Sequence, residues 1–203
     1  MARAARLSVD ERRARLLELG LELFSKRSYD DVSTDDIASA AGVSKGLLYH
    51  YFSGKRGYYV ATIRELARRV ISVTELQPSV TLEDAVRTSL QSFVVFVRDN
   101  ADFYRALLRG GVGADDEAQP IIESVRQTVS KRILARAGVA EPPPRMRTAV
   151  YGWIGFIEAT SLDWIANGHD HDEEELLGLM MSSFVALVGV GLSGEGPGLV
   201  RPN

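Results

Sequence analysis

Hydrophobic residues recur every three or four positions along almost the whole chain, which is the spacing of amphipathic α-helices. In the segment 8–27, for example, Leu16, Leu17, Leu23 and Phe24 fall on one side of a helix. No stretch alternates hydrophobic and polar residues convincingly enough to predict a strand. The pattern therefore predicts an all-α fold of about nine helices, at residues 8–27, 34–41, 44–52, 53–76, 81–99, 102–109, 115–137, 145–167 and 172–192.

Residues that favour helix ends stand near the ends of these segments. Ser8 and Glu11 have the spacing of a capping box, in which each side chain bonds to the other residue's backbone amide. Pro78 and the Glu-Pro-Pro-Pro run at 141–144 separate neighbouring helices, because the residue before a proline disfavours helical dihedrals. The Gly- and Pro-rich residues 194–203 are expected to form a disordered tail.

The segment 33–55 has the pattern of two short helices that meet at a tight turn. Ser33 or Thr34 caps the first helix, and Gly42 suits the left-handed backbone that ends it. Ser44 caps the second helix, whose Leu48 and Phe52 lie four apart and face inward. This arrangement is a helix-turn-helix, and the second helix of that motif enters the major groove of DNA. Its outward face carries Lys45, Gly46, Tyr49 and His50.

An ordered set of residues from about Arg15 to Tyr59 resembles the tetracycline-repressor (TetR) family of bacterial transcription regulators. One position departs from that family's pattern: Ser28 stands before Tyr29, where the family usually has glycine. A left-handed backbone at Ser28 would cost on the order of 1 kcal/mol. The matching elements are Leu16-Leu17, Leu23-Phe24, Tyr29-Asp30, Ile37-Ala38, Ala41-Gly42-Val43-Ser44, Leu48-Tyr49, Phe52 and Lys55.

The resemblance implies a three-helix DNA-binding domain at 1–54 and an effector-binding and dimerisation domain at 55–193. It further implies a homodimeric repressor that binds a palindromic operator and is released by a small-molecule effector. Lys45 is a long donor suited to guanine or phosphate, and Leu47 offers an apolar surface for a thymine methyl group. The family's DNA contacts fall here on Thr34, Ser44, Lys45, Gly46, Leu47, Tyr49, His50 and Lys55.

Small residues at helical spacing mark the segment 145–167, and they allow another helix to approach closely. In the resembled family the last two helices pair with their twofold mates in a four-helix bundle, so we expect a dimer interface here. Packing inside a single chain is the alternative interpretation of the same stripes. The expected interface residues are Gly152, Gly155, Ala159, Leu176, Met180, Ser183, Phe184 and Leu187.

Aromatic residues gather on the central helices and on another face of the segment 145–167. Such stripes usually form plain core, but the resembled family binds small effectors inside this domain. Glu158 and Asp163 interrupt the apolar helix; each could orient a ligand, but a surface or an interface is the expected place for both. The expected ligand-binding residues are Phe93, Phe96, Phe103, Leu107, Trp153, Phe156 and Ile157.

Charge is divided unevenly along the chain. Residues 1–57 contain ten Lys and Arg against eight Asp and Glu, a net charge of +2, whereas the whole chain has a net charge of −3. A positive head on an acidic body fits a DNA-binding domain joined to a domain with another task. No apolar run reaches the ~20 residues of a membrane span, and the N-terminus lacks the apolar stretch of a signal peptide. We therefore expect a cytoplasmic protein.

Catalysis has little support in the composition. The absence of cysteine excludes disulfides, thiol nucleophiles and cysteine-ligated zinc. The segment His169-Asp170-His171-Asp172 offers ligands, but a solvated loop explains it better than a metal site. We expect no enzyme activity, no cofactor and no metal. A helical metal-dependent enzyme and an adaptor that does not bind DNA remain the alternatives.

Overall fold

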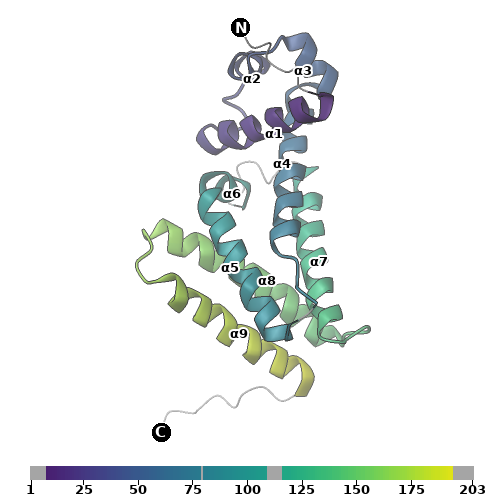
Figure 1. Cartoon of the computed structure of the whole chain (residues 1–203), viewed down its shortest axis with the longest axis vertical. Coiled ribbons are helices and arrows are strands. Elements are labelled where there is room, and N and C mark those ends of the chain that lie inside the picture. The colour runs from purple at the N-terminus through teal and green to yellow at the C-terminus, as the bar shows by residue number, and fades with distance from the viewer. Residues whose placement is uncertain (1–7, 79, 109–115, 194–203) are drawn as a thin grey trace. The chain divides into compact units, whose positions relative to one another are not determined.

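The computed structural model describes residues 8–78, 80–108 and 116–193, and these residues form α-helices without any β-strand. The all-α prediction is confirmed, and nine helices are found in the described residues (Figure 1). The predicted tail, 194–203, lies outside the described residues. The helices are α1 (Val9–Lys26), α2 (Thr34–Ala41), α3 (Lys45–Tyr51), α4 (Gly54–Val73), α5 (Leu82–Asp99), α6 (Ala101–Leu108), α7 (Ala118–Arg136), α8 (Pro144–Ala166) and α9 (Glu173–Ser193).

The helices divide into two compact units. The first unit comprises Met1–Arg69 and Asn100–Ile122, and the second comprises Val70–Asp99 and Glu123–Asn203. The first unit thus holds α1, α2, α3, α6 and most of α4. The second holds α5, α8, α9 and most of α7.

The first unit is built around aromatic and aliphatic side chains of α1, α3 and α4. The Tyr58 hydroxyl donates a hydrogen bond to the Leu16 carbonyl oxygen, and burial raises the pKa of this phenol. Gly20 of α1 lies so close to α4 that an added Cβ would stand 2.3 Å from Thr62 Oγ1. The close approach of these two helices therefore depends on the missing side chain at position 20.

The second unit is organised by the packing of α8 against α9. The Trp153 and Phe184 rings lie 4.8 Å apart between centroids, and the Trp153 indole nitrogen donates to Ser183 Oγ at 3.0 Å. Leu176 and Met180 are fully buried on the same side of α9. This contact orients the two helices and decides which of their faces remain exposed.

Ser28 does not need the left-handed backbone that glycine would provide. Among the described non-glycine residues, only His169 has a positive φ. The Ser28 hydroxyl instead donates to Asp31 Oδ2 at 2.6 Å, within the turn that leads to α2.

None of the helices in the described part of the chain combines the length and apolar content that a membrane crossing needs.

Candidate nucleic-acid interface

The helix-turn-helix is held by side-chain caps at both of its helices. Ser33 Oγ accepts a hydrogen bond from the Asp36 amide at 3.1 Å, and Asp36 Oδ2 accepts one from the Ser33 amide at 2.8 Å. Gly42 ends α2 with φ 63° and ψ 33°, and Ser44 Oγ accepts from the Leu47 amide at 3.2 Å. The caps at Ser33 and Ser44 and the left-handed turn at Gly42 are confirmed.

Asp36 is charged under most conditions because its surroundings favour the carboxylate. Hydrogen bonds from the Ser33 side chain and backbone, with a further one from Arg27, lower its pKa to about 2. A negative charge at this place also interacts favourably with the positive end of the α2 dipole.

The short helix α3 separates an inward face from an outward face. Leu48 and Phe52 are buried, as predicted, whereas Lys45 and His50 are exposed and Tyr49 is 56% exposed. Gly46 and Ser44 are also exposed, and Leu47 and Thr34 are half-buried. The structure therefore brings the predicted residues of α3 to one accessible surface.

Lys45 is paired with a carboxylate in the structure. Its Nζ lies 2.6 Å from Oδ1 of Asp35, which stands in the first turn of α2, and both side chains are more than half exposed. Asp35 was not among the residues singled out in the sequence. An acidic first turn is ordinary for a helix, and only the fold shows that this carboxylate reaches α3.

Lys55, at the start of α4, is held by two groups that precede α2. Its Nζ lies 4.3 Å from the centre of the Tyr29 ring and 3.4 Å from the Asp30 carbonyl oxygen. The first contact is a cation–π interaction, which leaves the ammonium group available to an anion. Gly54, just before it, has φ 84°, a backbone that disfavours other residues.

The exposed apolar face of the second unit differs from the predicted one on α9. Gly152 and Ala159 of α8 are exposed and Gly155 is half-buried, so they remain accessible. On α9, however, Leu176, Met180 and Phe184 are buried in this chain's own core. Their side chains are therefore covered within this chain, and Met180 and Phe184 contact Trp153 of α8, so the exposed part of the predicted stripe is smaller than expected. Ser183 and Leu187 are half-buried, and the large hydrophobic side chains exposed on the described parts of α8 and α9 are Phe156, Leu179 and Val185.

The predicted ligand-binding residues fall into different units. Phe103 and Leu107 belong to the first, and Phe93, Phe96, Trp153, Phe156 and Ile157 to the second. All except Phe156 are buried. The Trp153 ring packs against Phe184, and its indole nitrogen donates a hydrogen bond to Ser183. None of the seven lines the groove described next.

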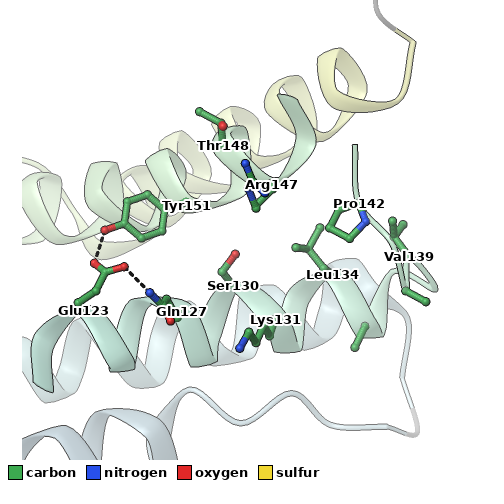
Figure 2. Close-up of a pocket in the computed structure, with 12 residues that line it drawn as sticks. Glu123, Gln127, Ser130, Lys131, Leu134, Val139, Pro142, Arg147, Thr148 and Tyr151 are labelled. Atoms are coloured by element: carbon green, nitrogen blue, oxygen red, sulfur yellow. Dashed lines mark hydrogen bonds between the residues drawn. The ribbon is translucent and has the colours of Figure 1, made fainter. Parts of the chain in front are cut away.

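A groove of about 720 Å³ runs between α7 and the start of α8 (Figure 2). At one end Glu123 accepts hydrogen bonds from the Tyr151 hydroxyl at 2.5 Å and from Gln127 Nε2 at 2.8 Å. These bonds lower the pKa of Glu123, and that carboxylate raises the pKa of Tyr151. The lining residues are Glu123, Gln127, Ser130, Lys131, Leu134, Ala135, Val139, Ala140, Pro142, Arg147, Thr148 and Tyr151.

A partly buried ion pair also joins α7 to α8. Arg126 Nε and Nη2 lie 3.0 and 2.6 Å from Glu158 Oε2, and Glu158 is only 7% exposed. The hydrogen bonds to Glu158 raise the pKa of Arg126. The expectation that Glu158 lies at a surface is wrong, because an arginine on a neighbouring helix makes its burial possible. Asp163 is exposed, as expected.

The histidines of the α8–α9 connection contact residues close to them in the chain. His171 Nδ1 lies 2.8 Å from Asp170 Oδ1, and the His169 ring lies 4.3 Å from the Trp164 ring. Within the described ranges, no three side chains of the types that bind metals come together.

Comparison with known proteins extends the resemblance over most of the chain. A family model described as "Bacterial regulatory proteins, tetR family" matches residues 16–57, and one described as "Tetracyclin repressor-like, C-terminal domain" matches residues 82–187. The HTH-type transcriptional activator FasR of Mycolicibacterium smegmatis is 33% identical over 177 residues, 85% of this chain and 80% of FasR.

Two further similar proteins are also transcription regulators. The HTH-type transcriptional regulator BetI of Escherichia coli is 25% identical over 169 residues, which cover 80% of this chain and 86% of BetI. A crystal structure of a tetR-family transcriptional regulator from Streptomyces coelicolor is 34% identical, with a TM-score of 0.82 over 93% of this chain and 85% of that one.

Proposed function

Because the chain belongs to the TetR family of DNA-binding transcription regulators, we propose that it acts as a homodimer on a palindromic operator. In this proposal the α3 helix of each protomer enters the major groove of one half-site, about 34 Å from its twofold mate. The observation that carries the proposal is the capped helix-turn-helix with Lys45, Tyr49 and His50 on its exposed face. Since such a regulator works on bacterial DNA, we place it in the cytoplasm.

The individual contacts follow from the chemistry of each side chain. Lys45 and His50 can donate to base edges or to phosphates, and Gly46 permits close approach of the backbone. Lys55, held against Tyr29 near the start of α4, suits a phosphate. Tyr49 and Thr34 would add hydroxyl contacts to the backbone of the DNA.

The dimer interface in this proposal is the exposed apolar face of α8 and α9. It combines Gly152, Gly155 and Ala159, which admit a close helix, with the large exposed side chains of Leu179 and Val185. Neither α8 glycine has another side chain within 4 Å of the place where a Cβ would stand, so there is room for a second helix. Exposed apolar surface of this kind marks an association site.

Regulation by a small molecule is the last part of the proposal. An effector bound in the second unit would favour a spacing of the two α3 helices that no longer fits the operator. By linkage, operator DNA must then weaken effector binding by the same factor. A tenfold effect needs only ~1.4 kcal/mol of differential affinity.

The direction of control has two candidates. Repression with release by the effector is the first. The name of FasR, a transcriptional activator, favours activation as the second. Measuring transcripts of neighbouring genes after deletion of this gene separates them, since loss of a repressor raises expression and loss of an activator lowers it.

The DNA-binding assignment is tested by fluorescence anisotropy with a duplex from the promoter of the protein's own gene. We expect Lys55→Ala and Tyr49→Ala to weaken binding without loss of helical content. Lys55→Ala should also flatten the plot of log affinity against log salt by about one unit, because one fewer counterion is released. Arg145→Ala, which removes a charge from the second unit, serves as the matched control. Unchanged affinity and slope for Lys55→Ala would contradict the assignment, and absence of any binding would favour the adaptor.

A further inference from the structure

The groove between α7 and α8 has the features of a ligand site. It is separate from the aromatic residues that the sequence predicted to bind a ligand. Its volume of about 720 Å³ lies within the range of ~300–1,000 Å³ typical of small-molecule sites. All of its lining residues belong to the second unit, so the site is complete within one part of the chain. Figure 2 shows side chains from α7, from α8 and from the connection between them around this space.

Ser130 is the most informative residue of the groove. It is 5% exposed, and its hydroxyl forms no hydrogen bond with any other residue in the described part of the chain. Other helical hydroxyls in this protein donate to the carbonyl one turn earlier, as Thr128 does to Ser124 and Ser161 does to Ile157. The Ser130 hydroxyl is not one of the buried side-chain atoms that lack a partner, so it opens onto the groove, where a bound group can accept its hydrogen bond.

Two cationic residues line the groove together with Ser130. Lys131 follows it on α7, and Arg147 comes from the first turn of α8 (Figure 2). Neither forms an ion pair with a carboxylate among the described residues, although several arginines of this unit and its neighbour do, such as Arg126, Arg87 and Arg105. The carboxylate of the groove, Glu123, stands at one end and is already bonded to Tyr151 and Gln127.

The opposite end of the groove is apolar. Leu134 is buried, Val139 and Pro142 are half-buried, and all three line the space next to the α7–α8 connection (Figure 2). The groove thus passes from a carboxylate end, through a cationic middle with a free hydroxyl, to an apolar end.

From this order of groups we propose that the groove binds a small amphipathic organic anion. Its carboxylate, sulfonate or phosphate group lies by Ser130, Lys131 and Arg147, and its apolar body lies on Leu134, Val139 and Pro142. The Ser130 hydroxyl donates to the anion, and the two cations supply charge complementarity. The proposal names a site and a ligand class that the proposed function leaves open, and it is tested on the free protein without DNA.

The test uses two fluorescent probes that differ only in charge, 8-anilinonaphthalene-1-sulfonate and its neutral counterpart N-phenyl-1-naphthylamine. Each is titrated into the full-length protein without DNA. We expect the sulfonate to bind more tightly than the neutral probe. Lys131→Gln combined with Arg147→Gln should weaken the sulfonate by about tenfold, the equivalent of ~1.4 kcal/mol, and leave the neutral probe within twofold.

Two further variants complete the experiment. Ser130→Leu fills the floor of the groove and should weaken both probes, with helical content checked by circular dichroism. Arg145→Gln removes a charge from α8 outside the groove and should change neither affinity. The proposal is overturned if the sulfonate has no advantage over the neutral probe. It is also overturned if the Lys131 and Arg147 substitutions leave sulfonate binding unchanged. Lys131 and Arg147 are both exposed, so we expect these variants to fold.

Discussion

Single polar residues set the geometry of the DNA-binding face before any DNA is present. Ser33 and Asp36 satisfy each other's backbone amides at the start of α2, and the Arg27 guanidinium lies 3.4 Å from the same carboxylate. Asp35, the neighbour of Asp36, pairs with Lys45 on α3. Two adjacent carboxylates therefore perform separate tasks, one within its own helix and one across the turn.

The Ser33–Asp36 pair predicts how the domain responds to acid. The pKa of Asp36 is about 2 in the folded protein, below the value of ~3.9 for an unfolded chain. The stability it contributes is therefore fully present above about pH 4 and is lost as the pH falls towards 2. We expect Ser33→Ala to raise the pKa of Asp36 towards the unfolded value, as measured by NMR titration of the side-chain carboxyl carbon. An unaltered pKa in Ser33→Ala would contradict this, and Ser39→Ala, at an exposed position of the same helix, is the control.

At the scale of helices, the contact between α1 and α4 depends on Gly20. A Cβ there would stand 2.3 Å from Thr62 Oγ1, and Thr62 is fully buried with its hydroxyl bonded to the Tyr58 carbonyl. Overpacking costs about 1–3 kcal/mol, while alanine gains about 1 kcal/mol over glycine in a helix. We expect Gly20→Ala to lower the free energy of unfolding by roughly 1 kcal/mol, measured by urea denaturation.

Two variants check the cause of that loss. Gly178→Ala has no heavy atom within 4 Å of the new Cβ and should be neutral or stabilising. Adding Thr62→Ala to Gly20→Ala should recover part of the loss, since the clashing atoms are removed. Equal effects of Gly20→Ala and Gly178→Ala would mean that close packing at position 20 is unimportant.

The ion pair between α7 and α8 gives a second prediction for helix packing. Arg126→Met removes the guanidinium that pairs with the buried Glu158 carboxylate, and breaking such a pair costs about 3–5 kcal/mol. Because Arg126 is partly exposed, we expect a loss near 3 kcal/mol, measured by thermal and urea unfolding. Arg126→Met combined with Glu158→Met should be much closer to the wild type. A double variant as unstable as the single one would show that packing, and not charge, causes the loss.

Local signals predicted the helices well. Ser8, Ser33 and Ser44 cap the helices predicted to follow them, and Gly42 takes the left-handed backbone. These features depend on residues three or four positions apart, which a sequence displays directly. The inward positions of Leu48 and Phe52 follow from the same spacing.

Contacts between distant helices were not predictable in the same way. Met180 and Phe184 share a stripe on α9 that fits a dimer interface and a core equally well, and only the position of Trp153 on α8 decides for the core. Glu158 needed Arg126, 32 positions away, to be recognised as a buried residue. The groove between α7 and α8 likewise combines residues from two helices. The helical periodicity of the sequence does not reveal that these residues lie close together.

For the whole molecule, the central prediction concerns assembly. Val185 is 57% exposed and Leu179 51%, both on the proposed interface of α9. We expect Val185→Glu or Leu179→Glu to give monomers by light scattering, since a charge would be desolvated at the contact. The same variants should lose operator affinity, because the two half-sites are then bound independently.

A matched control is available for this experiment. Val80 is 41% exposed but lies outside α8 and α9, so Val80→Glu should remain dimeric. If Val185→Glu and Leu179→Glu also stay dimeric, the interface lies on another surface. Gly155→Trp, which introduces bulk in place of charge, tests the α8 side of the same contact.

The pair of Asp35 and Lys45 bears on how a regulator finds one site among many. A genome offers about 10⁶–10⁹ competing sequences, so weak attachment to the wrong ones matters as much as strong attachment to the right one. Asp35 forms an ion pair with Lys45 in the free protein, and its negative charge repels phosphates near it. This repulsion acts on every DNA sequence alike. Only a sequence that presents an acceptor where Lys45 can reach it compensates for the lost partner. If Lys45 contacts DNA as proposed, we expect the carboxylate to shorten the stay on random DNA, so that the regulator continues its search along the chromosome.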